Sequence, residues 1–373
     1  MHPELSALFR RLTQLRVAAG YTAAEVEELL VIGPGWIKEF ESGNREPSFG
    51  TLAAILNIYG ERMDTFFVGL DLDEGVILDR HLAAEADGDD LILHFPMGSH
   101  KAKVKVADAT IDDFNEVLSV LRDGLAHGAP REAVADCFLK AARLWPHANP
   151  SDLWYFVVSH AYQDHLNHPA QTAGRDLSQS WKRTSGWSLE SIFVTHYNPH
   201  LNSHGIRLDM PAPEQKRVYL SEMGLNSEAD AEKSDIIVLG ADGSGREHPF
   251  GVIHVKASFA ERRTDDAPLS MKLMRSNYVS TLLTMDCKAS PSVSPINRGE
   301  LGPTQGGPER VSSKRLDIER DRIFDAVFAY NANTIPTPRG TNVAARINVC
   351  DFANPDDAFS THLVRRWKER QGP

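Results

Sequence analysis

Apolar residues recur with helical spacing along the N-terminal part of the chain. Between residues 4 and 18, leucine and phenylalanine return every three or four positions, which predicts an amphipathic helix. Thr22 and Glu25 then form the capping-box pattern TAAE at the start of a second predicted helix, EVEELL. The breaks IGP and NREPS each precede a further helical run, WIKEFESG and TLAAILNIYG. The pattern therefore predicts an all-helical N-terminal domain over residues 1–70.

Residues 71–110 change to charged and then alternating patterns. The runs DLDEG and EADGDD, within residues 71–90, favour a solvated acidic linker. The string DDLILHFPMGSHKAKVKVADA follows and predicts a β-hairpin. Lys101, Lys103 and Lys105 alternate onto one face of its second strand, where they either contact phosphates or protect an edge strand from pairing with other chains. The pattern favours edge protection.

The remaining residues, 111–373, predict a helical segment followed by a mixed α/β domain. Amphipathic stretches fill residues 111–182, and an apolar stripe continues through RTSGWSLESIFVTHYNPHL, with Glu190 in its expected first turn. The runs DIIVLG and FGVIHVKAS, joined by the turn-rich ADGSGREHP, predict an antiparallel pair of strands. DRIFDAVFAYNANT and AARINVCDF predict further strands. Residues 289–314 are rich in Pro, Gly and Ser, and so predict either a mobile segment or a loop that orders on a partner.

Composition narrows the class of protein. A chain of 373 residues that is 42% apolar and 24% charged is long enough for two or three domains and excludes disordered, collagen-like and coiled-coil classes. The N-terminus lacks a signal-peptide pattern and the apolar runs are short, so we expect neither export nor a membrane span. Cys137, Cys287 and Cys350 are an odd number and lack metal-ligand spacing, which indicates a reducing, cytoplasmic protein; Cys287 and Cys350 are expected in the core.

The net charge of −11 is unevenly distributed. Residues 1–150 carry 14 basic against 24 acidic residues, a net charge of −10, whereas residues 151–373 carry 26 against 27. Because the electrostatic field depends on arrangement as well as on the sum, the C-terminal part can still form a basic groove for nucleic acid.

One acid and one lysine stand out in the predicted strand pair. Asp235 opens the first strand and Lys256 ends the second, and their midpoint falls in the turn, so antiparallel pairing brings their side chains together. The period of two also places His254 on the face of Lys256. A strand acid and a strand lysine beside Mg²⁺ are the pattern of a PD-(D/E)xK nuclease, here with Ser234 for proline and His254 for the second acid. The pair alone is also common at protein surfaces.

A metal site for phosphodiester hydrolysis needs more carboxylate charge, because Mg²⁺ prefers oxygen ligands. Glu190 is the candidate for this second acid. Its alternative role is to stabilise a helix N-terminus, where acids interact favourably with the helix dipole.

Histidines and asparagines give weaker candidates. His196, His200 and His204 have near-helical spacing that metal ligation could use, but Pro199 is expected to interrupt the helix, and this favours polar helix-end residues. The asparagines at positions 331 and 333 are either groove contacts or turn residues, and turn residues are favoured.

The N-terminal string GYTAAEVEELLVIGPGWIKEFESGNREPSFGTLAAIL resembles the helix-turn-helix domain of the lambda-repressor or XRE family, over about residues 5–67. In such domains the first turn of the recognition helix enters the major groove with Arg, Gln, Asn or Ser side chains. This chain offers Trp36 and Lys38 there. Two roles follow from the resemblance: a scaffold for dimerisation or backbone contact, or base reading in which Lys38 is the candidate DNA contact.

The C-terminal segments WKRTSGWSLE, KSDIIV and VIHVKASFAERR resemble type II restriction endonucleases of the CCGG-recognising group (BsaWI/AgeI-like, PD-(D/E)xK superfamily). The resemblance covers about residues 150–365. It implies catalytic residues at Glu190, Asp235, Lys256 and Asp266, with Glu190 and Asp235 holding Mg²⁺.

The same resemblance implies residues that bind DNA. Glu261 and Arg262 match the readers of the inner C·G pairs, because Glu accepts from cytosine N4 and Arg spans guanine O6 and N7. Arg263, Asp265 and, in the first segment, Arg183 are further candidate contacts. The alternative is that ERRTDD is a solvated charge run.

We therefore expect a multidomain α+β protein, with an all-α helix-turn-helix domain and a mixed α/β PD-(D/E)xK domain. The expected function is Mg²⁺-dependent cleavage of double-stranded DNA at a site containing CCGG. A palindromic site implies a homodimer. The alternatives are an XRE-type transcriptional regulator or antitoxin with a non-catalytic C-terminal domain, and a repair or mobile-element nuclease of relaxed specificity.

Overall fold

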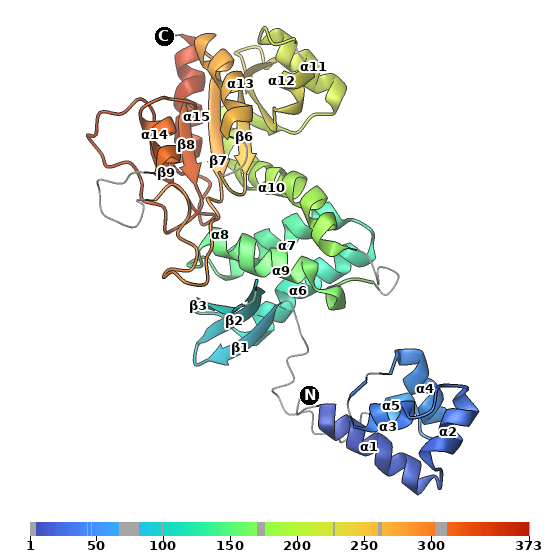
Figure 1. Ribbon diagram of the computed structural model, residues 1–373. Helices are drawn as coiled ribbons and strands as arrows, with labels where there is room; N and C mark the ends of the chain where they lie inside the picture. Colours follow the sequence, from blue (N-terminus) through green and yellow to red (C-terminus); the bar gives the residue numbers. More distant parts are fainter. Residues whose placement is uncertain are drawn as a thin grey trace. The chain divides into compact units, whose positions relative to one another are not determined.

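A computed structural model describes most of the chain and divides it into two units, Met1–Asp79 and Arg80–Pro373 (Figure 1). The described residues are 5–42, 44–45, 47–66, 82–98, 100–169, 176–226, 228–259, 263–302 and 312–372.

The N-terminal unit is helical, as its apolar spacing predicts. Its helices are α1 (Leu5–Ala18), α2 (Ala23–Leu30), α3 (Trp36–Glu41), α4 (Phe49–Ile58) and α5 (Met63–Phe66). The Thr22 side chain accepts a hydrogen bond from the backbone of Glu25, so the predicted capping box is confirmed. Apolar residues from all five helices form its core.

Two polar contacts hold α3 in place. Gly35 precedes α3 with a φ of 86° and offers no side-chain cap, and the buried carboxylate of Glu27 on α2 instead accepts the backbone N–H of Ile37 at 2.9 Å. Arg16 on α1 donates to Glu41 at the end of α3 at 2.6 Å. These contacts fix the helix pair that the helix-turn-helix resemblance singles out.

The second unit begins with an antiparallel sheet in the order β1-β2-β3. Its strands are β1 (Ala83–Asp87), β2 (Asp90–Met97) and β3 (His100–Val106). The predicted hairpin is confirmed, but the linker prediction is wrong for residues 83–87, which pair with β2. A strand with one solvated face tolerates acidic side chains, so composition alone did not reveal it. The predicted linker residues 71–81 lie outside the described residues.

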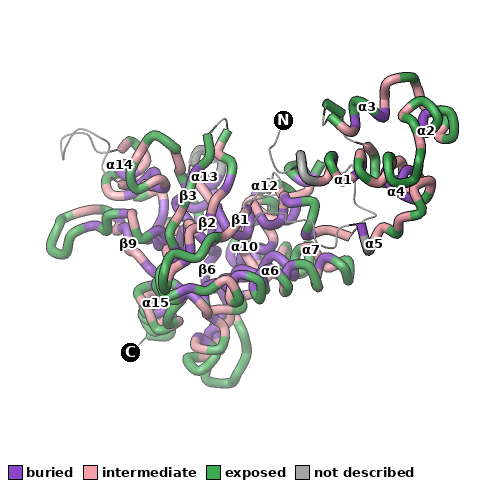
Figure 2. The backbone as a smooth tube through the Cα atoms, turned by 90° about the horizontal axis from the view of Figure 1, so that it is seen from below, coloured by how far each residue is buried: buried purple, intermediate pink, exposed green. Residues whose placement is uncertain are grey.

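Helices follow the small sheet, as predicted. They are α6 (Ile111–Ala126), α7 (Pro130–Leu144), α8 (Pro150–Asp152), a π-helical turn (Leu153–Val158), α9 (Ser159–Gln163), a 3-10 turn (His165–Asn167) and α10 (Leu177–Leu201). Figure 2 shows buried residues along α6 and α10.

Helix α10 corrects two predictions. It begins at the N-cap Asp176, so Glu190 lies in its middle and not in a first turn, and a helix-dipole role for Glu190 is excluded. It also continues through Pro199. Proline costs the helix one hydrogen bond there, and the burial of Tyr197 and Leu201 on either side stabilises the helical conformation.

The large sheet has the order β4-β5-β6-β7-β8-β9. Its strands are β4 (Ile206–Asp209), β5 (Ile236–Ala241), β6 (Glu247–Lys256), β7 (Val279–Thr284), β8 (Ala326–Ala329) and β9 (Ile347–Val349). The predicted strands β5, β6, β8 and β9 are confirmed. Strands β4, β5 and β6 pair antiparallel, and β6 to β9 pair parallel. A β-bulge interrupts the β5–β6 pairing: Val238 pairs with Gly251, but Leu239 pairs with Pro249.

Helices cover both faces of this sheet. The remaining helices are α11 (Pro213–Glu222), α12 (Glu228–Glu232), α13 (Arg263–Arg275), α14 (Ser313–Glu319) and α15 (Ala358–Gln371), with a 3-10 turn at Asn202–His204. Along β5, Ile236 and Val238 belong to the core formed with α10 and α15, whereas Ile237 and Leu239 pack with α11 and α13. Strands buried on both faces explain the continuous apolar runs in the sequence.

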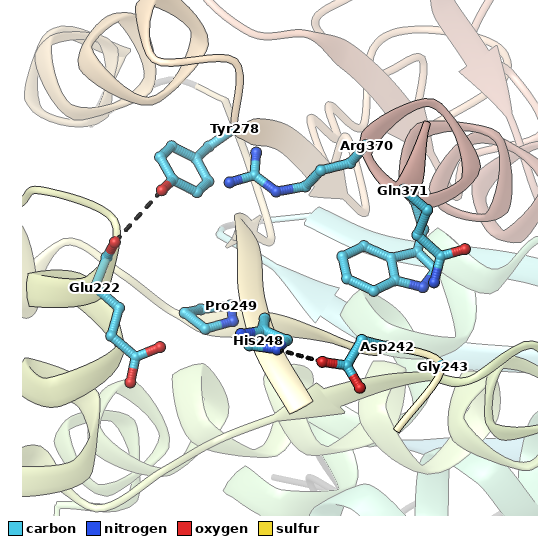
Figure 3. A pocket seen from close by; sticks show the side chains of 9 residues that line it. Glu222, Asp242, Gly243, His248, Pro249, Tyr278, Arg370 and Gln371 are labelled. Atoms are coloured by element: carbon cyan, nitrogen blue, oxygen red, sulfur yellow. Dashed lines mark hydrogen bonds and ion pairs between the residues drawn. The ribbon is translucent and has the colours of Figure 1, made fainter. Parts of the chain in front are cut away.

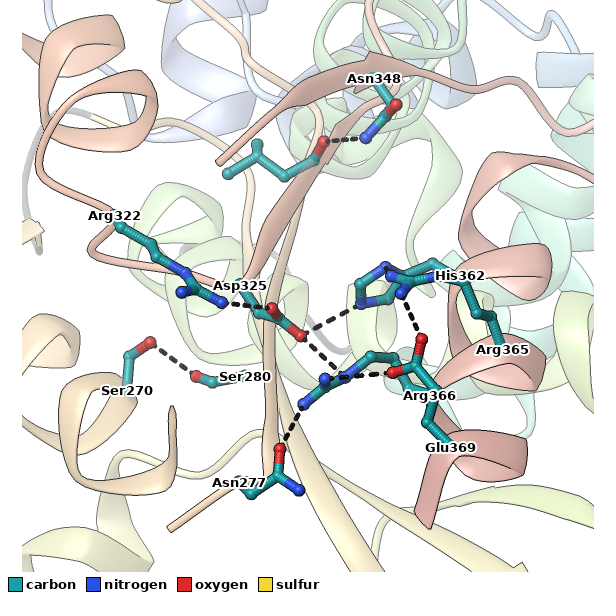
Figure 4. Close-up of polar contacts among 11 residues, drawn as sticks. Ser270, Asn277, Ser280, Arg322, Asp325, Asn348, His362, Arg365, Arg366 and Glu369 are labelled. Atoms are coloured by element: carbon teal, nitrogen blue, oxygen red, sulfur yellow. Dashed lines mark hydrogen bonds and ion pairs between the residues drawn. The ribbon is translucent and has the colours of Figure 1, made fainter. Parts of the chain in front are cut away.

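Helix α15 is anchored at the end of the sheet opposite Lys256. Asp325, just before β8, forms ion pairs with His362 at 3.3 Å and Arg366 at 3.4 Å (Figure 4). Burial alone would raise the pKa of Asp325, but His362 and the nearby arginines outweigh it and hold the pKa below its ordinary value.

All three cysteines are buried and free, and the core positions expected for Cys287 and Cys350 are confirmed. Among the described helices, none is long and apolar enough to cross a membrane.

Candidate active site

Asp235 and Lys256 meet at one end of the β5–β6 pair, as the sequence predicts. Asp235 immediately precedes β5, Lys256 ends β6, and Asp235 Oδ2 lies 2.7 Å from Lys256 Nζ. The same oxygen accepts the backbone N–H of Val255 at 2.7 Å. The carboxylate is therefore fixed to β6 by two donors, and its other oxygen, Oδ1, has no hydrogen bond from a described residue.

Asp266 completes an ion-pair cluster around the lysine. It lies in the first turn of α13, is 4% exposed, and places Oδ2 3.3 Å from Lys256 Nζ. Burial alone would lower the pKa of Lys256, but the charges of Asp235 and Asp266 outweigh it and raise the pKa above its ordinary value. Lys256 is thus a stable cation between two carboxylates.

Glu190 approaches this cluster from α10. Burial raises its pKa to about 8, and the negative charge of Asp235 adds to the rise. The charge of Asp235 therefore acts on Glu190, so the two carboxyl groups belong to one electrostatic cluster. The sequence analysis named all four of these residues, and the structure brings them to the same end of the large sheet.

Two cations beside Glu190 were missed by the sequence analysis. Lys216 on α11 donates to the backbone oxygen of Ser234 at 2.6 Å, and its charge lowers the pKa of Glu190, as does that of Arg131 at the start of α7. Neither residue belongs to a recognisable spacing. They reach the site because α11 follows β4, the neighbour of β5, and because α7 packs along α10.

His254 takes a structural position. It is fully buried, its Nε2 atom lies 3.2 Å from Ser280 Oγ on β7, and its ring packs against Phe324. Burial lowers the pKa of His254 and so favours the neutral ring.

The donor set fits a divalent cation. Among the described residues there is no cluster of three or more histidine, cysteine or acidic side chains arranged for a metal. Glu190 and Asp235 nevertheless offer hard oxygen ligands. Burial and the charge of Asp235 raise the pKa of Glu190, and a bound divalent ion would favour its ionised form. Phosphate and water oxygens can complete the coordination of such an ion.

The other sequence candidates are distributed differently. Glu261 and Arg262 lie outside the described residues, and the side chains of Arg263 and Asp265 are likewise not described. Arg183 is exposed on α10, two helical turns before Glu190. Lys38, on α3, is exposed in the N-terminal unit.

The three histidines of the HYNPHLNSH string have separate surroundings. His196 packs against Phe352, and burial lowers its pKa to about 4. His200 lies 3.8 Å from Asp356, and its ring is 5.0 Å from that of His204. Asn331 is buried and donates to the backbone oxygen of Asp286, which fits the expected turn role.

Two cavities lie away from the cluster around Lys256. One, of about 580 Å³, is at the turn end of the β5–β6 hairpin and is lined by His248, Tyr278 and Arg370, among others (Figure 3). Another, of about 480 Å³, borders α15 and Asp325. Both lie at the opposite end of the strands from Lys256.

A mixed sheet covered by helices, with an acid before one central strand and a lysine at the end of the next, defines the class of PD-(D/E)xK nucleases. Over 242 residues the chain is 39% identical to the type II restriction enzyme AgeI of Thalassovita gelatinovora, covering 63% of this chain and 83% of that enzyme. The chain belongs to this family of type II restriction endonucleases, and it is a site-specific DNA endonuclease.

The solved structure of AgeI bound to DNA agrees with this assignment. The crystal structure of the specific AgeI–DNA complex matches 74% of this chain and 99% of that chain, with a TM-score of 0.65 at 34% identity. The crystal structure of the pre-specific BsaWI–DNA complex matches 69% and 95%, with a TM-score of 0.34 at 17% identity. Residues 7–64 separately match a family model described as a helix-turn-helix domain.

Proposed function

We propose that the protein cleaves double-stranded DNA at a site containing CCGG, using Mg²⁺ held by Glu190 and Asp235. The observation that carries the proposal is the cluster of Asp235, Lys256 and Asp266 with Glu190 beside it, on the fold of an enzyme family that includes AgeI. Type II restriction enzymes in general use a divalent metal, and Mg²⁺ is the ion that an all-oxygen donor set favours.

Each residue of the cluster has a distinct task. Mg²⁺, when bound, supplies Lewis acidity toward the scissile phosphate. Lys256 stays protonated between its two acids, so it orients the attacking water and stabilises the negative charge of the transition state. Asp266 holds the Lys256 ammonium in position from α13. Glu190 must lose its proton before it can bind the metal.

Specificity is assigned to the segment after β6. Glu261 and Arg262 follow the strand that ends at Lys256, so base readers there would enter the same DNA groove as the active site. We assign the inner C·G pairs to them, with Arg263, Asp265 and Arg183 as further DNA contacts. A symmetric recognition site, together with one cluster of this kind among the described residues of each chain, supports a homodimer that cuts both strands.

We propose that the N-terminal domain stabilises the complex without reading bases. The Arg45 guanidinium lies over the Trp36 ring at 3.5 Å, so that ring, at the start of α3, is engaged within the domain. Lys38 is exposed and suits a phosphate contact. The proposed domains are a helix-turn-helix domain over residues 1–70, a connecting region over 71–110 and an endonuclease domain over 111–373. We expect the protein to act in the cytoplasm, where free buried cysteines stay reduced.

The decisive experiment is digestion of a phage genome by the purified protein in Mg²⁺, followed by sequencing of the fragment ends. We expect discrete fragments whose ends share CCGG, and Asp235→Ala should abolish cleavage while the circular dichroism spectrum stays unchanged. A smear of random ends would indicate a nuclease of relaxed specificity. A protein that binds DNA without cleaving it would instead support the regulator.

A further inference from the structure

A positively charged groove lies beside the small sheet. It has a volume of about 490 Å³ and is lined on one side by β3, including Lys101 and Lys103, and on the other by loop residues 291–296. Strand β3 is the edge strand of its sheet, so its outer backbone groups have no partner strand. The groove therefore combines lysine side chains with open backbone donors.

The two lysines are available for an external anion. Lys101 and Lys103 are exposed and form no ion pair with a described residue. Lys105, the next in the row, is instead paired with Asp90 at 2.6 Å and with Asp87 at 3.3 Å. A role in edge protection gives no reason why Lys105 is paired and the other two lysines are not. Binding of an external anion, by contrast, needs unpaired cations.

The far wall of the groove is built directly on the catalytic end of the large sheet. After β7 the chain continues beside β6: Met285 donates its N–H to the Lys256 oxygen at 3.1 Å, and Cys287 donates to the Ala257 oxygen at 3.0 Å. The loop then closes on itself, because Ala289 bridges Asn297. The loop that forms this wall thus continues directly from the end of the large sheet that carries Lys256.

Polar contacts also fix the position of this wall against the helices. Asn297 is fully buried and donates its side-chain amide to Asp152 Oδ1 at 2.8 Å and to Ser151 Oγ at 2.8 Å. Asp152 is the acid that lines the groove, and burial raises its pKa to about 6. Its Oδ1 atom accepts from Asn297, and among the described residues Asp152 forms no ion pair with Lys101 or Lys103.

We propose that this groove holds the sugar-phosphate backbone of the DNA substrate beside the cleavage site, with Lys101 and Lys103 contacting phosphates. The inference rests on the proposed function. Duplex DNA is the occupant we choose because the groove is cationic, open, and continuous with the end of the sheet where the scissile phosphate must lie. Contacts of this kind position the duplex and carry no base information.

Salt-dependent binding tests the proposal. Binding of a CCGG duplex and of a scrambled duplex is measured by fluorescence anisotropy in Ca²⁺ over a series of KCl concentrations. Each phosphate contact adds about 0.9 to the magnitude of the negative slope of log K against log salt, and the proposed homodimer carries each lysine twice. Lys103→Gln should therefore reduce the magnitude of the slope by about two, and Lys101→Gln/Lys103→Gln by about four. Both duplexes should lose affinity by the same factor.

Lys368→Gln is the matched control. This exposed lysine follows Trp367 on α15, which packs on Phe250 at the start of β6, the opposite end of the strand from Lys256. Lys368→Gln removes the same charge as each groove variant and should leave the salt slope unchanged.

The outcomes are separable. If the wild type neither binds nor cuts DNA, the proposed function fails and the groove assignment fails with it. If the wild type cuts DNA but the lysine variants keep its slope and affinity, only the groove assignment is overturned. A loss confined to the CCGG duplex would also overturn it, because the lysines would then act in base reading.

Discussion

The protonation of single residues decides how this site can work. Lys256 is held as a cation by two acids, whereas Glu190 is pushed toward its neutral form by burial and by Asp235. At the proposed metal site, Glu190 would therefore have to lose one proton before it could bind the ion. Metal binding and pH are coupled at this one carboxyl group.

Removing the metal should expose this coupling as a stability effect. The folded-state pKa of Glu190, about 8, lies above its ordinary value of 4.5, so the folded protein binds this proton more tightly than the unfolded chain. The stabilisation is complete below the unfolded-state pKa and is lost as pH rises from about 5 to about 8. In EDTA, the melting temperature should fall over this range more steeply for the wild type than for Glu190→Gln.

Addition of Mg²⁺ at the upper end of this pH range should raise the melting temperature of the wild type and not that of Glu190→Gln. Parallel melting curves for the two proteins at every pH would remove Glu190 from the proposed metal site.

Arg262 gives the residue-scale test of specificity. A bidentate arginine–guanine contact is worth about 1–3 kcal/mol, so Arg262→Ala should lose roughly 5- to 150-fold in preference for a CCGG core over a scrambled duplex in Ca²⁺. Cleavage should still depend on Mg²⁺, because no proposed metal ligand is changed. Equal weakening on both duplexes would make Arg262 a phosphate contact.

At the scale of elements, α15 packs tightly against the large sheet. Gly240 on β5 lies directly under the ring of Trp367 on α15, and a Cβ atom placed there would overlap the indole. Trp367 also packs against Phe250, with ring centroids 4.8 Å apart. The absence of a side chain at position 240 is what allows α15 to lie on the sheet.

Gly240→Ala should therefore lower the free energy of unfolding by roughly 1–3 kcal/mol, the usual cost of overpacking. Urea denaturation of Gly240→Ala, Trp367→Leu and the double variant would isolate the contact, because the alanine should cost much less once the indole is gone. Gly243→Ala, in an open turn with no atom near the new Cβ, is the control and should change little. An additive double variant would show that the indole is not what excludes the alanine.

Elements with strong local patterns could be predicted from the sequence, and those that depend on distant contacts could not. The capping box of α2 and the pairing of β5 with β6 are encoded within a few residues of each element, and both are confirmed. The first residue of α10, by contrast, lies thirteen residues before Glu190, because burial against α7 stabilises helix beyond the apolar stripe. The acids and the lysine of the proposed active site could be named from motifs, but Lys216 could not, since its place follows from the order of strands.

At the scale of the whole molecule, two units divide the chain, and every proposed catalytic residue belongs to the second. Three-quarters of the chain suffices to match nearly all of the AgeI chain, so the family fold does not need the rest. Deletion of residues Met1–Asp79 should leave the cut sequence unchanged and weaken the apparent affinity or the dimer. Fragment-end sequencing and sedimentation would measure both, and a new cut sequence would show that the N-terminal domain reads bases.

The β-bulge between β5 and β6 determines which residues of the two strands lie on the same face of the sheet. The register between the bulge and Lys256, continued by one residue, sets Asp235 opposite His254. Asp235 therefore lies on the same face of the sheet as Lys256. With the register of the turn end, Asp235 would stand opposite Ile253, and the acid and the lysine would point to opposite faces. The one extra residue in β6 thus decides whether the acid and the lysine share a face of the sheet. A single deletion there would disable the enzyme although every proposed catalytic residue remained in the chain.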